Sequence, residues 1–194
     1  LHDVRGLSVH FMLDIDGTIY QTLDVKERAW HAAQANSRSI GIEIANIGAY
    51  PPGKASPLDD WYGKDGAGRT RITLPDWIGD GSVRTKGFVG YPDRPARLPG
   101  ELPGVAYEMH DFTPEQYAAL AKLTATLCTV FPKIACDYPR GPDGNLLTEA
   151  LTDEAYESFG GLVGHINLTE GKDDPGPAKQ RDRHIDDARN HKTT

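Results

Sequence analysis

A short segment late in the chain carries the side chains best suited to chemistry. It covers residues 164–179 and reads GHINLTEGKDDPGPAK. His165 is predicted to end a strand over residues 162–166, while Lys172 and Asp174 follow in a loop that two prolines make rigid. This spacing lets an imidazole and a carboxylate converge on one metal ion. Taken singly, each residue has a plainer interpretation as a hydrogen-bonded surface group, so the hypothesis depends on the rest of the chain.

A second candidate group stands on the strand predicted over residues 39–47, SIGIEIANI. Side chains alternate between the two faces of a strand. One face carries Ile40, Ile42 and Ile44, and the other carries Gly41, Glu43 and Ala45. Glu43 therefore stands between two very small residues, on a face with room for a ligand. Its plainer interpretation is a surface carboxylate on an edge strand.

The stretch DIDGT, residues 14–18, has two competing interpretations. It is spelled like the nucleophile loop of haloacid-dehalogenase-type phosphatases, which also need an apolar parallel strand before the loop and a late acidic pair after another such strand. It is also the turn of a hairpin over residues 7–23, in which Asp16 and Gly17 supply the positive φ angles of a type I′ turn. Only the hairpin places Met12 opposite residues just past the turn. We favour the hairpin, because no late acidic pair follows an apolar strand.

Two helices and a long irregular tract complete the predicted elements. Residues 113–116, TPEQ, form a capping box that begins a helix with one apolar stripe as far as residue 131. A shorter helix is predicted over residues 153–159. Residues 50–107 are rich in Gly and Pro, and their aromatic side chains predict an ordered insertion beside a site. The charged tail over residues 179–194 is predicted to fray or to form an isolated polar helix.

Composition excludes several classes of function. The chain has 194 residues and a formal net charge of -7, so it lacks the basic field that attracts nucleic acid. No apolar run approaches the roughly 18 residues of a membrane-spanning helix, and the chain is expected to be soluble. Cys128 and Cys136 lack CxxC spacing, and either a single bridge or two free thiols fits them. The oligomeric state cannot be read from the sequence.

Five short motifs follow one another in an order that resembles a known family. They read DGTIYQ, RAWHA, NSRSIGIEI, FTPEQYAAL, and GH followed by K-x-DPGP. In this order they resemble the zinc-dependent N-acetylmuramoyl-L-alanine amidases, the amidase-2 and peptidoglycan-recognition-protein family. The resemblance covers residues 7–49 and 111–178. It implies an α/β fold with a mixed central β-sheet flanked by α-helices, in which residues 1–178 form the amidase domain, residues 50–107 a long insertion, and residues 179–194 a polar tail.

The resemblance also implies a reaction and a cofactor. Such enzymes hold one Zn²⁺ in a groove and hydrolyse the amide bond between N-acetylmuramic acid and L-alanine. The implied substrate is peptidoglycan or its muropeptides, which indicates a secreted protein, extracellular or periplasmic. Position by position, His165 and Asp174 resemble zinc ligands, Glu43 the acid/base carboxylate, and Lys172 the cation beside the reacting carbonyl. The positions that resemble the lining of the substrate groove are Trp30, His31 and Asn36.

The chain departs from the family in its third zinc ligand, a His that would stand on a strand upstream of Leu1. His2 is a poor substitute, because it falls in the last turn of a predicted helix that Gly6 ends. His10 is also a poor substitute, because its counterpart in the family is not a ligand. Two explanations stay open: an N-terminal segment is missing from this sequence, or a zinc-poor relative binds peptidoglycan without cutting it. The otherwise complete set of site residues favours the first.

Overall fold

The predicted hairpin is part of a three-stranded sheet. In the computed structural model, which describes residues 6–102, 104–172 and 174–192, strand β1 (Phe11–Leu13) pairs antiparallel with β2 (Ile19–Gln21). It also pairs in parallel with β3 (Ile42–Ile44), so the order is β2-β1-β3. Met12 lies opposite Tyr20, the antiparallel pairing that excludes the phosphatase interpretation. Alternation buries the side chains on either side of Met12 and leaves Met12 exposed.

The turn of this hairpin differs from the predicted type I′ turn. The Asp14 N–H donates to the Thr18 carbonyl at 2.9 Å, and the Gly17 N–H donates to the Asp14 carbonyl at 3.0 Å. Within this loop only Gly17 has a positive φ, +80°, whereas a type I′ turn needs two such residues. Asp16 instead accepts backbone N–H groups of Thr18 and Thr85, each at 2.9 Å. Burial would raise the pKa of Asp16, but these contacts with Thr85 and Thr18 hold it at about 2.

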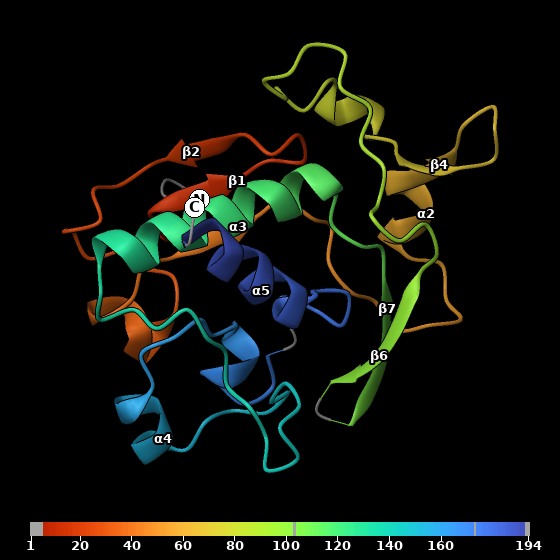
Figure 1. Ribbon diagram of the computed structural model, residues 1–194. Helices are drawn as coiled ribbons and strands as arrows, with labels where there is room; N and C mark the ends of the chain where they lie inside the picture. Colours follow the sequence, from red (N-terminus) through yellow and green to blue (C-terminus); the bar gives the residue numbers. More distant parts are fainter. Residues whose placement is uncertain (1–5, 103, 173, 193–194) are drawn as a thin grey trace.

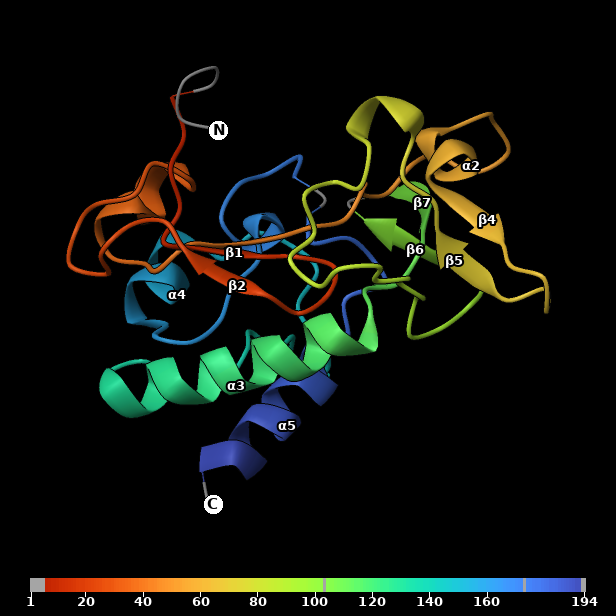
Figure 2. The same ribbon diagram turned by 90° about the horizontal axis from the view of Figure 1, so that it is seen from above.

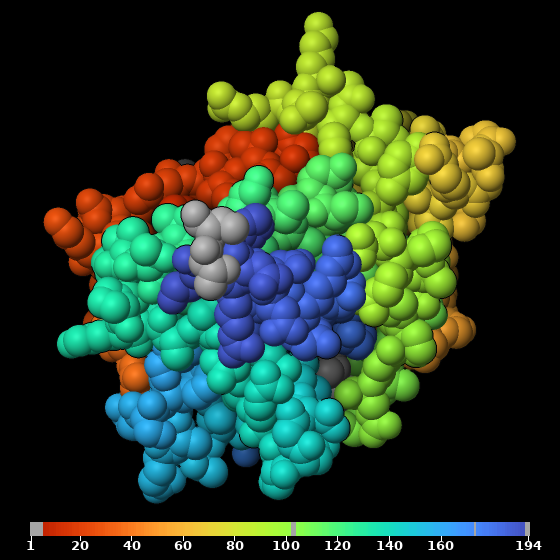
Figure 3. Space-filling view, viewed as in Figure 1, coloured from red at the N-terminus to blue at the C-terminus, as the bar shows by residue number. Residues whose placement is uncertain are grey.

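Helix α3 (Pro114–Val130) backs the sheet, where it contacts β1, and helix α5 (Arg181–Lys192) packs against α3 (Figures 1 and 2). The predicted capping box is confirmed: the Gln116 N–H donates to Thr113 Oγ1 at 3.1 Å, and the Thr113 N–H donates to Gln116 Oε1 at 3.0 Å. Figure 3 shows α5 at the centre of one face of the molecule.

Helix α5 corrects the prediction of a frayed or isolated tail. The helix exists, and its side chains at positions 181, 184, 185 and 188 are buried. This spacing is one helical face, but two of the four residues are polar, so the sequence showed no apolar stripe. His184 Nε2 is hydrogen-bonded to Thr124 Oγ1 of α3 at 2.8 Å. Burial, together with the charge of Lys179, lowers the pKa of His184 to about 3, so the buried imidazole is neutral.

Residues 50–107, here called the arm, project from one side of the molecule (Figures 1 and 2). The arm has regular structure. Its elements are helix α2 (Pro57–Trp61), strands β4 (Tyr62–Lys64) and β5 (Thr70–Ile72), the 3₁₀ turn η2 (Asp76–Ile78), strand β6 (Leu98–Leu102) and most of strand β7 (Val105–Met109). Strands β4 and β5 form one antiparallel pair, and β6 and β7 form another. The described residues thus hold three small sheets rather than one large central sheet.

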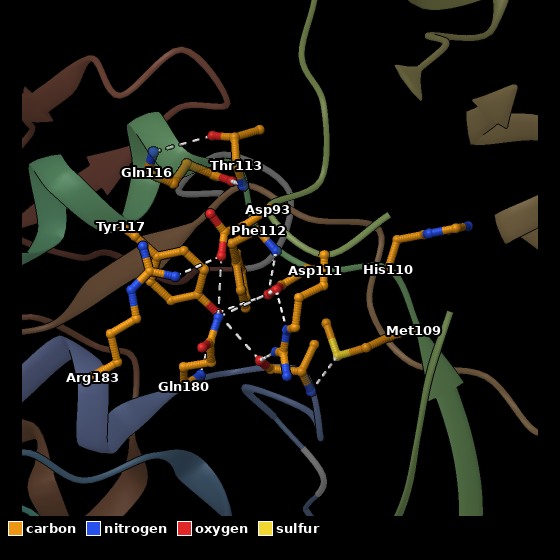
Figure 4. Close-up of polar contacts among 12 residues, drawn as sticks. Asp93, Met109, His110, Asp111, Phe112, Thr113, Gln116, Tyr117, Gln180 and Arg183 are labelled. Atoms are coloured by element: carbon orange, nitrogen blue, oxygen red, sulfur yellow. Dashed lines mark hydrogen bonds and ion pairs between the residues drawn. The ribbon is translucent and has the colours of Figure 1, made fainter. Parts of the chain in front are cut away.

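Two neighbouring carboxylates, Asp93 and the buried Asp111, join the arm to both helices (Figure 4). The Asp111 side chain is fully buried and accepts hydrogen bonds from Arg94 Nε at 2.6 Å and from the Tyr117 hydroxyl at 2.7 Å. Next to it, Arg183 Nη1 of α5 binds Asp93 Oδ2 at 2.5 Å. Polar contacts therefore hold the arm, the start of α3 and the start of α5 together.

The remaining elements are short. Helix α4 (Asp153–Ser158) confirms the predicted second helix, and Thr152 Oγ1 accepts the Ala155 N–H at 3.2 Å as its N-cap. The strand predicted over residues 162–166 is wrong, because a 3₁₀ turn, η3 (His165–Asn167), begins within it. A second such turn is η1 (Ala33–Ser37). None of the described helices combines the length and the apolar character needed to cross a membrane.

Candidate active site

A cavity of about 710 Å³ opens between β3 and the segment around His165. Residues 39–44 form one wall, residues 160–165 and 174–176 form the opposite wall, and α3 and α5 contribute the deeper lining. Four of the predicted site residues lie on these walls: His31, Glu43, His165 and Asp174. The other three do not line the cavity: Trp30, Asn36 and Lys172.

The shortest contact at the site joins His165 to Asp174. His165 Nδ1 is hydrogen-bonded to Asp174 Oδ2, and His165 Nε2 lies 2.8 Å from the carbonyl oxygen of His31. Both ring nitrogens therefore face oxygen acceptors, an arrangement that the doubly protonated imidazolium satisfies. The hydrogen bond to Asp174 raises the pKa of His165 against the effect of burial. Burial likewise opposes ionisation of Asp174, but the hydrogen bond from His165 holds the pKa of that carboxyl below its usual value.

Backbone contacts place His165 and Asp174 side by side without a strand. Gly164 is extended, and η3 begins directly after it. The Gly164 N–H donates to Asn167 Oδ1 at 3.2 Å, and the Ile166 N–H donates to the Asp174 carbonyl at 3.2 Å. The predicted strand fails here because the segment binds loop backbone and a side chain instead of another strand.

His31 packs where β3 begins. A Cβ atom on Gly41 would lie 2.8 Å from the His31 ring, so only glycine leaves room for this imidazole. The Ser39 hydroxyl lies 3.3 Å from His31 Nε2. Burial, together with the charges of the neighbouring His10 and His165 rings, lowers the pKa of His31 to about 4. His31 is therefore a neutral group on the cavity wall.

His10 and Asn36 stabilise the backbone next to the cavity through hydrogen bonds. His10 is buried, and its Nε2 and Nδ1 bind the Glu27 carbonyl and the Gly41 N–H, each at 3.0 Å. Asn36 is also buried, and its Oδ1 accepts the N–H groups of His31 at 2.9 Å and Ala32 at 2.7 Å. Asn36 thus orients the chain at His31, although its side chain does not reach the cavity.

Three predicted residues are open to solvent. Glu43 is exposed on β3 between two half-buried isoleucines, and its charge is among those that raise the pKa of His165. Lys172 is exposed, and its charge contributes to the lowered pKa of Asp174. Trp30 is 53% exposed, with the Arg28 guanidinium 4.4 Å from its ring centroid.

Two buried cations on the cavity wall were missed by the sequence analysis. Arg181 is 8% exposed, and burial lowers its pKa to about 10, although the charge of Asp174 opposes this effect. Lys179 is also 8% exposed, and burial together with the charge of Arg181 lowers its pKa to about 7. Both lie in the polar segment after residue 178. Of the two, only Arg181 has a signal in the sequence, which is its helical spacing with Ile185 and Ala188.

The comparison with protein families matches residues 2–177 to the family described as N-acetylmuramoyl-L-alanine amidase. The chain belongs to that family. The match includes the arm, whose status as an insertion relative to other amidases stays a prediction. No curated protein and no solved structure matches the chain. Membership in this amidase family makes the function of peptidoglycan-amidase type, with cell-wall peptidoglycan as the substrate class.

Proposed function

We propose that this amidase uses zinc to hydrolyse the amide bond between N-acetylmuramic acid and L-alanine in peptidoglycan or muropeptides. The observation that carries the proposal is the contact of His165 with Asp174 on one wall of a cavity whose other wall presents Glu43. A cavity of about 710 Å³ falls within the size range of ligand sites, about 300–1,000 Å³.

The donor atoms fit a zinc ion in kind. An imidazole nitrogen of His165 and a carboxylate oxygen of Asp174 are two of the three protein ligands that a catalytic zinc site needs. Binding would require His165 to lose one ring proton, so affinity should fall at low pH. Within the described residues no group of three or more His, Cys, Asp or Glu side chains converges. The proposed third ligand is the family's upstream His; His2 lies outside the described residues.

Glu43 is the proposed proton carrier. The chemistry expected of zinc at this site is polarisation of the scissile carbonyl and acidification of water. Glu43 is exposed and lines the cavity, and in this proposal its carboxylate takes the proton of the attacking water and delivers it to the departing amine of L-alanine.

Lys172 and His31 complete the proposed site. Lys172 adds positive charge beside Asp174 and would stabilise the tetrahedral oxyanion electrostatically, a contribution of roughly 3 kcal/mol where single donors have been removed. His31 stays neutral, so it can accept or donate a hydrogen bond to the substrate without adding charge. Trp30 is proposed to contact the substrate outside the cavity, where its ring is exposed.

The test is a comparison of wild type with Glu43→Gln. The variant should bind zinc as wild type does while the release of L-alanine-containing peptides from cell-wall fragments falls about 10²-fold or more. Glu154→Gln, an exposed glutamate on α4, is the matched control and should keep full activity. Undiminished activity of Glu43→Gln would mean that another group transfers the proton. Binding to cell-wall fragments without zinc or peptide release would favour the alternative, a non-catalytic peptidoglycan-binding module.

The substrate class leads to a proposed location. Peptidoglycan lies outside the cytoplasmic membrane, so we place this amidase in the periplasm or the extracellular space. Fractionation of cells that express the natural gene would test the location.

A further inference from the structure

A buried guanidinium lies directly behind the turn that carries His165. Arg181 comes from the start of α5, and its Nη1 donates a hydrogen bond to Asn167 Oδ1 at 2.6 Å. A Cβ atom on Gly164 would lie 2.5 Å from Arg181 Nη2. The residue just before His165 can therefore be only glycine while the guanidinium keeps this position.

Asn167 connects Arg181 to the rest of the turn through hydrogen bonds. Its Oδ1 also accepts the Gly164 N–H at 3.2 Å, and its Nδ2 donates to the carbonyls of Leu147 at 2.8 Å and Glu149 at 3.0 Å. The amide thus uses both of its acceptor sites and both of its donors, and the residue is 0% exposed. A side chain bound on every side admits one orientation, so η3 has a fixed direction relative to α5.

The same turn is tied to the segment of Asp174. The Ile166 N–H donates to the Asp174 carbonyl, and the opposite charges of Asp174 and Arg181 attract each other. Lys179 provides the contrast, because it is equally buried on the cavity wall. Its Nζ has no hydrogen-bond partner and lies 4.7 Å from the centroid of the Tyr117 ring. Of these two buried cations, only Arg181 is bonded to the turn that carries His165.

We propose that Arg181 is a positioning residue, which acts through Asn167 to hold the His165 imidazole against Asp174 in the geometry that binds a divalent metal ion. This inference rests on the proposed function. Helix α5, in the segment that the sequence marks as a polar tail, would then be part of the machinery of this amidase. Partners that orient metal ligands from behind typically change metal affinity 10- to 100-fold when they are removed.

The experiment measures zinc affinity rather than turnover. Metal-free full-length wild type, Arg181→Met, Arg181→Lys and Arg189→Met compete for zinc with a chromogenic chelator. Each is also loaded with Co²⁺ for its visible absorption spectrum. Arg189 is the matched control: it is an arginine of α5 that binds the Cys136 carbonyl at 3.0 Å, away from the turn of His165. Thermal unfolding of the metal-free proteins shows whether each variant is folded.

The expected dissociation constant for zinc rises about tenfold or more in Arg181→Met, with an altered Co²⁺ spectrum. Arg181→Lys, which keeps the charge and one donor, should lie between Met and wild type, and Arg189→Met should equal wild type. Equal zinc binding by Arg181→Met and wild type would overturn this inference alone, even if the variant were less stable. A wild type that binds no zinc would overturn the proposed function as well. If Arg181→Met does not fold, Arg181→Lys decides, and a wild-type dissociation constant there overturns the inference.

Discussion

The two walls of the cavity hold their functional groups in different ways. Glu43 stands on β3, whose backbone pairs with β1, so alternation along the strand sets its direction. His165 and Asp174 stand in a segment without a strand, whose order depends on buried side chains such as Asn167. Backbone hydrogen bonds between paired strands persist through most side-chain substitutions. A segment ordered by side-chain hydrogen bonds can lose its structure when one residue is replaced. The two walls should therefore respond unequally to substitution.

The largest expected effect is the loss of Asn167. Asn167→Ala removes a side chain with four hydrogen bonds and leaves buried groups unpaired, so the free energy of unfolding should fall by about 4 kcal/mol. Ile42→Val on the β3 wall should cost only about 1 kcal/mol. Chemical denaturation of both variants measures the difference. Equal losses would show that the two walls do not differ in this way.

The second effect is a gain in stability when Lys179, which lines the same cavity, is replaced. Lys179→Met removes a buried ammonium without a hydrogen bond and should raise the free energy of unfolding by about 2 kcal/mol at pH 7. Because the pKa of Lys179 is lowered to about 7, the unfolded chain binds more protons between pH 7 and 10.5, so wild-type stability should rise with pH across that window. The variant should lose that rise. A destabilised variant would show that the amine has a partner in solution.

The third effect is acid sensitivity at the junction of α3 and α5. The pKa of His184 is lowered to about 3, so its contribution to stability is intact above the ordinary value of 6.5. As the pH falls from 6.5 towards 3, the unfolded state binds a proton that the native state does not, which costs about 1.4 kcal/mol per pH unit. In His184→Gln, the free energy of unfolding should fall less steeply than in wild type as the pH decreases from 6.5 towards 3, by about 1.4 kcal/mol per pH unit. Unfolding curves at several pH values measure this difference. An unchanged slope would contradict the buried neutral imidazole.

The smallest effect concerns the link between the hairpin and the arm. Asp16→Ala removes the acceptor of the Thr85 N–H at a partly exposed position and should cost about 1 kcal/mol, with zinc binding unchanged. Limited proteolysis of the arm, compared with wild type, should become faster. A loss of zinc binding would mean that the arm and the cavity are coupled.

Local patterns explain what could be predicted from the sequence. The hairpin, the strand of Glu43 and the helix that begins at Thr113 depend on alternation and capping within a few residues, and the structure contains all three. The juxtaposition of His165 with Asp174 also follows from short spacing. The turn type at Asp16 depends on which residue takes the positive φ, and composition alone does not decide that.

Contacts between distant segments explain what the sequence did not reveal. The strand predicted over residues 162–166 has the right residues, but its backbone binds loop partners. Helix α5 has no apolar stripe, because Arg181 and His184 are buried through hydrogen bonds to Asn167 and Thr124. Whether a cation is buried depends on where its partner lies in space, and a single sequence does not contain that information.

The dependence of η3 on α5 also orders events during synthesis. Arg181 leaves the ribosome after His165, so the imidazole emerges from the ribosome before the guanidinium that orients it. Premature termination between Asp174 and Arg181 would yield a chain that keeps Glu43, His165 and Asp174, the residues assigned to proton transfer and metal ligation, yet lacks the guanidinium that orients His165. In this fold, competence for the reaction would be one of the last properties that the growing polypeptide acquires.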